Sequence, residues 1–368
     1  MGVLIDTSKF LCRVGRDIAS AARVLLVAAS VVLPCVSAYS QQAHVDSAQP
    51  ADGFKPLQIG SLTISGELRG RGQGWNWFLG DTRTRYAFGS TVLNLGLSQQ
   101  LGKIGWKLEF SQPALYNLPG DAFQPGTGLP LGLGPIYFAA NSNQRNAAGI
   151  FLKQGYLSIQ GIDRNHSLLR IGRFAFSEGR EKTPREKDLA WLTHERIAQR
   201  LIGDSEWTGI SRSFDGVHFS EELGRNTNLT FAAGRAASGV WQADGMGELD
   251  VDILYGAYTR EFPTPHTDSR LRVFGLGYHD GRGALKVDNR APSVAQADRS
   301  NIRIGTFGVN YALVTPLPYI GKWDLVLWGA QQIGHWGSLR QRANSALFEL
   351  GWRPPVPWIH PWLRAGAL

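Results

Sequence analysis

Basic side chains recur beside apolar residues in segments that alternate with a period of two. The candidate positions are Arg69, Arg71, Lys107, Arg170, Arg173, Arg212, Arg270, Arg272 and Arg303, with Glu67 and Glu109, and further Asp250 and Asp252, as acidic partners. A guanidinium binds a carboxylate through two parallel hydrogen bonds, and rings of Arg or Lys select anions. As a set, these residues predict a pathway for anions, although a structural salt bridge is an equal alternative for any single arginine.

The same alternation predicts the elements that position these side chains. In the segment Leu62–Gln73, Leu62, Ile64 and Leu68 share one face and the polar residues share the other, as in a strand. The pattern recurs at 93–98, 106–111, 169–171, 217–220, 228–233, 249–255, 270–279, 301–311, 322–333, 346–352 and 361–367. This indicates roughly twelve or thirteen strands, many near the 9–11 residues that cross an outer membrane.

These strands predict an all-β fold, an antiparallel transmembrane outer-membrane β-barrel over residues 61–368. A charge on the lipid face costs about 2–4 kcal/mol near the midplane, so most of the basic side chains are expected in the lumen. A soluble sandwich or propeller also alternates, but strand length, aromatic strand ends and the absence of a repeat of fixed period favour the barrel.

One segment has helical character. Pro184 precedes a stretch in which Leu189, Leu192, Ile197 and Leu201 follow an approximate helical spacing, and Pro is favoured in the first turn of a helix. We expect a short helix over 185–201, either folded into the lumen or lying in an external loop.

The composition fits an exported membrane protein. Of 368 residues only 18% are charged and 44 are Gly, against about 25% charged in soluble domains. Residues 1–38 predict a signal peptide cleaved after Ala38, because a basic start precedes a short apolar run and Val36-Ser37-Ala38. Residues 39–60 are expected to form a polar periplasmic lead. Both cysteines, Cys12 and Cys35, lie in the signal, so the mature chain has no disulfide and no Cys-ligated zinc.

No catalytic signature is present. The G-x-S-x-G, H-E-x-x-H, phosphate-loop and EF-hand patterns are absent, and the eight histidines are scattered. We expect no enzymatic activity, no cofactor, no metal site and no nucleic-acid partner.

One stretch is similar to a known family. The segment Arg200-Leu201-Ile202-Gly203…Trp207…Arg212-Ser213-Phe214-Asp215-Gly216 resembles the R-L-x-G…W-x-x-x-x-R-x-F-D-G segment of the alginate export family of outer-membrane proteins. Upstream, Lys153–Leu157 and Leu169–Arg173 look like that family's Q-x-Y-L and R-x-G-R strands. The resemblance implies a large antiparallel barrel that passes an acidic polyuronate through an arginine-rich lumen.

The residues and the resemblance together predict a bacterial outer-membrane channel for passive export or diffusion of an anionic, alginate-like polysaccharide or oligosaccharide. A general or weakly anion-selective porin for small solutes is the alternative. The expected partners are the anionic polysaccharide or small anionic solutes, the outer-membrane lipid and periplasmic export machinery.

Closure of the barrel is a separate expectation. A membrane barrel must close, because an open edge leaves backbone groups unpaired in lipid. The sequence stops within a strand-like segment, and the related family continues for several more strands. We therefore expect a C-terminally incomplete, open sheet with two free edges; the rival is closure by pairing of 357–368 with Leu62–Gln73.

Overall fold

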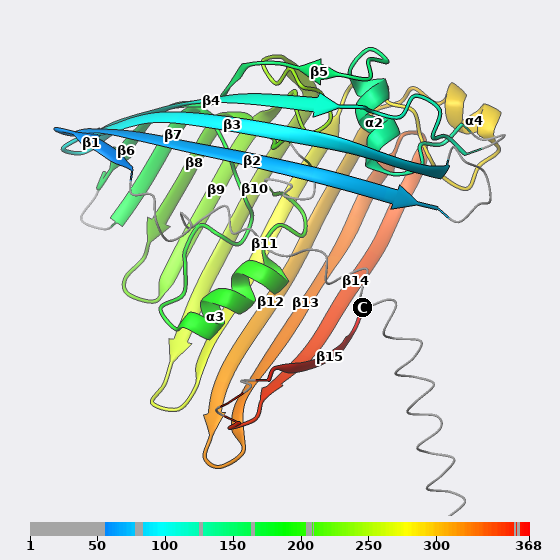
Figure 1. Ribbon diagram of the computed structural model, residues 1–368. Coiled ribbons are helices and arrows are strands. Elements are labelled where there is room, and N and C mark those ends of the chain that lie inside the picture. The colour runs from blue at the N-terminus through cyan, green and yellow to red at the C-terminus, as the bar shows by residue number, and fades with distance from the viewer. Residues whose placement is uncertain are drawn as a thin grey trace, which may run out of the picture. The chain divides into compact units, whose positions relative to one another are not determined.

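The computed structural model describes residues 56–77, 84–124, 128–162, 166–203, 208, 210–356, 358 and 361–368. Within this part of the chain, fifteen strands form one antiparallel sheet. Each strand pairs with the next along the chain, except that the short β5 lies off the path and pairs with β4 (Figure 1). The predicted all-β, antiparallel fold is therefore confirmed.

The strands are β1 (Leu57–Ile59), β2 (Leu62–Asn76), β3 (Arg85–Leu101), β4 (Ile104–Tyr116), β5 (Ala147–Ala148), β6 (Phe151–Gln160), β7 (His166–Phe174), β8 (Phe214–Glu222), β9 (Thr227–Ala237), β10 (Glu248–Pro263), β11 (Asp268–Asp280), β12 (Ile302–Leu317), β13 (Gly321–Trp336), β14 (Leu339–Arg353) and β15 (Leu363–Ala367). Residues 57–59, expected in the polar lead, already belong to the sheet because β1 pairs with β2. The predicted signal peptide lies outside the described residues.

The helical elements are α2 (Leu133–Ala140), α3 (Lys187–Leu192), the π-helical turn η2 (Thr193–Ile197) and α4 (Pro292–Ala297). The helix expected over 185–201 is thus shorter, and α2 and α4 were not predicted. Glu186 begins α3 by accepting a hydrogen bond from the Leu189 amide at 2.6 Å, a capping contact that favours a helix start. None of the helices in the described part is long and apolar enough to cross a membrane.

The two ends of the strands differ in their connections. Tight turns join strands at one end, which we call the short-turn end; Gly102 begins the β3–β4 turn at φ 62°, a conformation that favours glycine. At the other end, the long-loop end, lie the connections 117–150, 175–213 and 281–301. Short turns opposite long loops are typical of outer-membrane barrels.

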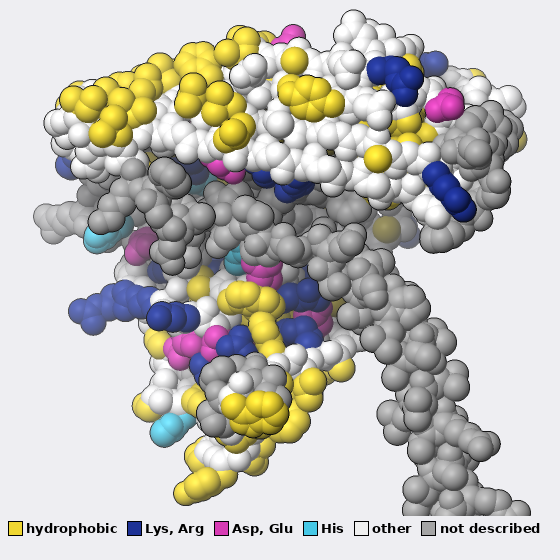
Figure 2. All heavy atoms as spheres, viewed as in Figure 1, with side chains coloured by type: hydrophobic (Ala, Val, Ile, Leu, Met, Phe, Trp, Pro, Cys, Tyr) yellow, Lys and Arg dark blue, Asp and Glu magenta, His cyan; other side chains and the backbone are white. Residues whose placement is uncertain are grey.

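The sheet has two chemically different faces. Its outward face exposes large apolar side chains such as Leu95, Phe110 and Phe348, and Figure 2 shows hydrophobic side chains gathered over the β2–β4 region. Its concave face carries buried residues including Phe88 and Val92. Strand side chains alternate between the two faces, so the face of each candidate residue follows from the register.

The concave face is partly filled by the connection 175–213, which we call the β7–β8 loop. Leu189, Leu192 and Ile197 of this loop are buried in one apolar cluster with Tyr255 and Trp328 of the sheet. Figure 1 shows α3 within the hollow of the sheet. Of the two placements left open by the sequence, the structure shows the inward one.

The sheet is open. Among the described residues, β15 pairs only with β14, and β1 pairs only with β2. The alternative in which 357–368 pairs with Leu62–Gln73 is wrong, and the expected sheet with two free edges is observed.

Candidate functional site

The predicted residues of β2 lie on the concave face. Arg69 is opposite Val92 and Arg71 is opposite Ser90 in the β2–β3 register, and residues directly opposite in an antiparallel pair share a face. Val92 and Ser90 are buried on that face. Arg69 and Arg71 are half-buried, and Glu67, two residues earlier, is exposed.

Lys107 and Glu109 of β4 continue this face. Lys107 Nζ lies 2.6 Å from one carboxylate oxygen of Glu109 and Lys153 Nζ lies 3.6 Å from the other. Gln154 also donates a hydrogen bond to Glu109 at 2.9 Å. Glu109, expected as a partner of arginines, is therefore shared between two lysines.

Arg170 of β7 has an aromatic environment. Its Nε donates a 3.2 Å hydrogen bond to His218 Nδ1. Its guanidinium carbon lies 5.5 Å from the ring centroid of Tyr156 and 5.7 Å from that of Phe174, within cation–π range. Arg170 is thus held on the concave face by a hydrogen bond to an imidazole nitrogen and by two aromatic rings.

Arg270 and Arg272 of β11 also point to the concave face, but the β7–β8 loop covers them. Both side chains are 1% exposed. Arg270 Nη1 donates to the carbonyl of Lys182 at 2.9 Å. These two arginines contact the loop rather than an open pathway.

Arg272 makes the densest polar contacts under the loop. It lies 2.6 Å from Glu181, whose side chain is 2% exposed. It also donates to the Tyr255 hydroxyl at 2.6 Å and to Thr259 Oγ1 at 2.9 Å. A buried charge needs such pairing, because an isolated one is costly to desolvate. Arg272 and Glu181 therefore anchor the loop to β11.

The structure corrects the placement of Arg173. It lies opposite Gly155 and Asp215, on the outward face, and binds both Asp215 carboxylate oxygens at 2.7 and 2.6 Å. Arg170 and Arg173 are three residues apart, an odd spacing that places them on opposite faces of one strand.

The structure also corrects the placement of Arg303, which was expected in the lumen. It pairs with His279 and His335 in the register of β11–β13 and is exposed on the outward face. Arg212 lies just before β8 rather than in a strand. Its Nε is buried, and burial, together with the nearby Arg282 charge, lowers its pKa.

Sequence reasoning missed an ionic cluster between the loop and the last strands. Glu349 of β14 binds Arg196 of η2 through both carboxylate oxygens, and Arg364 of β15 approaches it at 3.0 Å. Arg364 also binds Asp324. Arg196 and Glu349 are 153 residues apart, so local spacing carries no signal of this contact.

A second missed cluster lies at the short-turn end. Asp188 of α3 contacts Lys322 and lies 2.5 Å from Arg353 Nη1. Burial would raise the pKa of Asp188, but the bonds from Lys322 and Arg353 lower it overall. Lys182 meanwhile donates to the carbonyl of Arg225 in the β8–β9 turn. The β7–β8 loop thus starts at the long-loop end and reaches the short-turn end.

Glu178 of the loop is fully buried, at 0% exposure. One carboxylate oxygen accepts from the Leu201 amide at 3.1 Å. Burial raises the pKa of Glu178 to about 7, although the Arg272 charge acts in the opposite direction. Docking of the loop therefore places a carboxyl group that titrates near neutrality inside the hollow.

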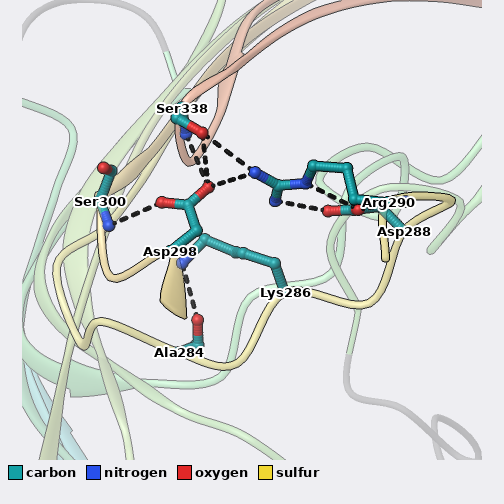
Figure 3. Close-up of polar contacts among 7 residues, drawn as sticks. All are labelled: Ala284, Lys286, Asp288, Arg290, Asp298, Ser300 and Ser338. Atoms are coloured by element: carbon teal, nitrogen blue, oxygen red, sulfur yellow. Dashed lines mark hydrogen bonds and ion pairs between the residues drawn. The ribbon is translucent and has the colours of Figure 1, made fainter. Parts of the chain in front are cut away.

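The connection 281–301 is ordered by a polar clasp (Figure 3). Asp298 accepts from the Ser338 amide and hydroxyl, both at 2.9 Å, and from the Ser300 amide at 3.0 Å. Arg290 bridges Asp298 and Asp288 at 2.9 and 2.7 Å. The bond from the Ser338 amide, followed by that from Arg290, holds the pKa of Asp298 well below its usual range. The clasp fixes this loop to the β13–β14 turn.

The described residues contain no group of three or more His, Cys, Asp or Glu side chains that could hold a metal ion. The arrangement on the concave face instead offers cations, partial neutralisation by carboxylates, and aromatic rings.

Comparison with known proteins identifies no family. No family model matches the chain, and no curated protein matches it. The resemblance to the alginate export family therefore stays a prediction.

Several solved structures are distantly similar to this chain. OprB of Pseudomonas putida has 12% identity over 79% of this chain and 83% of its own, with a TM-score of 0.36. OccAB1 of Acinetobacter baumannii has 10% identity over 79% and 74%, with a TM-score of 0.39. OmpT, an outer membrane protein of Vibrio cholerae, has 8% identity over 81% and 84%, with a TM-score of 0.31. Because these identities and TM-scores are low, the fold class is assigned from the strand pairing of this chain alone. It is an all-β, up-and-down antiparallel sheet.

Proposed function

We propose that this chain forms an outer-membrane channel in which an anionic, alginate-like polysaccharide or oligosaccharide moves passively over the basic concave face. The observation that carries the proposal is the difference between the two faces of the sheet. Leu68, Leu157 and Phe307 are 74%, 61% and 59% exposed on the outward face. Soluble monomers rarely expose a large contiguous apolar surface, whereas lipid would cover it.

The concave face supplies the other half of the argument. Arg69, Arg71, Lys107 and Arg170 keep partial exposure along β2–β7. Two unit charges at 4 Å attract by about 1 kcal/mol in water and about 4 kcal/mol at the partial screening of a protein surface. Several such contacts would hold a carboxylated sugar weakly enough for it to move on, as conduction requires.

A general or weakly anion-selective porin is the second candidate. The observation that favours it is the neutralisation of several cations on the same face. Glu109 contacts Lys107 and Lys153, and Glu349 contacts Arg196 and Arg364. Such pairs lower the net positive charge that a solute meets.

Single-channel conductance of the full chain in planar bilayers tests these functions. At low salt, an oligouronate should interrupt the current more than a neutral oligosaccharide of equal length, and added salt should weaken this effect because it screens charges. The double substitution Arg69→Ser and Arg71→Ser should reduce anion preference without unfolding the sheet. Arg260→Ser, on the outward face, is the matched control.

The outcomes separate the candidates. Equal effects of acidic and neutral sugars, with unchanged reversal potentials in the double variant, would support the general porin. Absence of any conductance from the folded wild-type chain would contradict both.

A further inference from the structure

A row of polar side chains crosses the outward face near the long-loop end. The register places Asp252, His279, Arg303, His335 and Arg340 directly opposite one another across β10–β14. Because all five lie at one level on neighbouring strands, they form a polar border at one edge of the apolar outward face.

An apolar groove lies next to this border. One row closer to the short-turn end, Leu254, Gly277, Gly305 and Ile333 are directly opposite one another, and Phe307 follows on β12. The resulting groove has a volume of about 840 Å³. The two glycines form its floor, and the flanking large side chains form its walls.

The border contributes positive charge to the groove. Arg303 is exposed and lines it, and no other residue in the described ranges forms an ion pair or hydrogen bond with its side chain. Asp252, the acidic residue of the row, is already bound by Arg235 at 2.8 Å. An adjoining groove of about 540 Å³ is lined by Arg340 and Arg342. The charge that a ligand in the groove would meet next to the apolar floor is therefore positive.

We propose that this groove binds an acyl lipid with a phosphorylated headgroup, in the leaflet at the long-loop end. The acyl chain lies over Gly277 and Gly305 beside Phe307, and the phosphate contacts Arg303. Phe307 lies four positions after Arg303, about 13 Å along the strand, so the sites for the headgroup and the acyl chain follow one another along β12. The proposal rests on the membrane placement of the outward face in the proposed function, but not on the solute that passes.

Charge complementarity favours a lipid over a second copy of the chain. The groove joins an apolar floor to an arginine that lacks a carboxylate, and a phosphate accepts charge-assisted hydrogen bonds from Arg. Phospholipids carry both parts in this order. A second copy would need an exposed carboxylate next to an apolar ridge at the same level.

The test uses the full chain purified in a neutral maltoside detergent. Native mass spectrometry counts the molecules retained after addition of dipalmitoyl phosphatidic acid, dipalmitoylglycerol or inorganic phosphate. Phosphatidic acid should bind at least about tenfold more tightly than dipalmitoylglycerol, because a hydrogen bond to a charged group is worth that factor or more. Phosphate alone should not be retained.

Two substitutions divide the site into its halves. Arg303→Gln should remove the preference for phosphatidic acid over dipalmitoylglycerol. Gly305→Leu should block retention of both, since an ideal Cβ there meets its nearest neighbour at 3.5 Å and leaves the fold intact while the side chain fills the groove. Arg260→Gln and Gly72→Leu, on the outward face away from the groove, are the controls; nothing lies within 4 Å of a Cβ at Gly72.

Equal retention of the two lipids by the wild type would overturn the proposal. Losses of lipid retention in the control variants as large as those in Arg303→Gln and Gly305→Leu would also overturn it. A change of oligomeric state in Gly305→Leu with lipid retention unaltered would also overturn it in favour of a second copy. Conductance of the same samples separates the two proposals: a wild type that binds phosphatidic acid selectively but does not conduct supports the lipid site and refutes the channel.

Discussion

The contact between Arg272 and Glu181 should control docking of the β7–β8 loop. Both side chains are almost fully buried, at 1% and 2% exposure, and their closest atoms are 2.6 Å apart. Substituting Glu181→Gln removes the carboxylate charge paired with the buried Arg272, while the hydroxyl groups of Tyr255 and Thr259 remain as hydrogen-bond partners. Removing one partner of a buried ion pair costs about 3–5 kcal/mol.

That cost has a measurable size. At about 1.4 kcal/mol per factor of ten, it raises the undocked population of the loop by roughly two to four powers of ten. Hydrogen exchange of the amides of α3 and η2 should accelerate accordingly, while exchange in β12 and β13 should change little. Conductance should rise, because the loop occupies the hollow.

Two further variants sharpen this test. The double substitution Glu181→Met and Arg272→Met should recover much of the protection, since an apolar pair leaves no unpaired charge. Arg235→Gln is the control, because the Arg235–Asp252 pair is 43% and 42% exposed and exposed pairs contribute little. Loop exchange in Glu181→Gln no faster than in Arg235→Gln would refute the reasoning.

Three other predictions follow from the loops and the N-terminus. The pKa of Glu178 is raised to about 7 in the docked loop, whereas the free carboxyl has a pKa of 4.5, so the docked state binds more protons. Docking of the loop should therefore weaken as the pH rises from about 4.5 to 7. A pH series of hydrogen-exchange measurements should show this dependence in the wild type and not in Glu178→Gln. Substituting Asp298→Asn should weaken the clasp of the 281–301 loop, seen as faster proteolysis there with conductance still present; an unchanged cleavage rate would count against the clasp. N-terminal sequencing of membrane-purified protein should begin after Ala38, and a start at Met1 would contradict the signal peptide.

Alternation in the sequence predicted the strands well because the two faces meet different surroundings. The segment 270–279 lies within the observed β11, Asp268–Asp280, and 301–311 coincides with the start of β12, Ile302–Leu317. Alternation alone does not say which face is concave. In β10, Val251 and Ile253 are buried against the β7–β8 loop, so Asp252, expected inside, lies outside with Arg235.

The placement of the loop could not be predicted, because its partners are distant in the chain. Leu192 and Ile197 pack with Phe274 and Val326, and Asp188 meets Arg353 from 165 residues away. The weak helical spacing in 185–201 showed an apolar side but not the surface that covers it. The ionic contacts of Glu349 were missed for the same reason.

The arginines that were predicted to line the lumen differ in their surroundings rather than in their sequence context. Arg270 and Arg272 are covered by the β7–β8 loop, and Arg173 and Arg303 face outward. The β2–β7 wall, with Arg69 and its neighbours, combines concave placement with partial exposure, and so do Arg196 and Arg364, which are bound to Glu349. Under the proposed function, a solute that passes while the loop stays docked is expected to move along β2–β7, where partly exposed cations belong to the sheet itself. Substitutions in that wall should alter selectivity, whereas substitutions under the loop should alter how often the hollow is free.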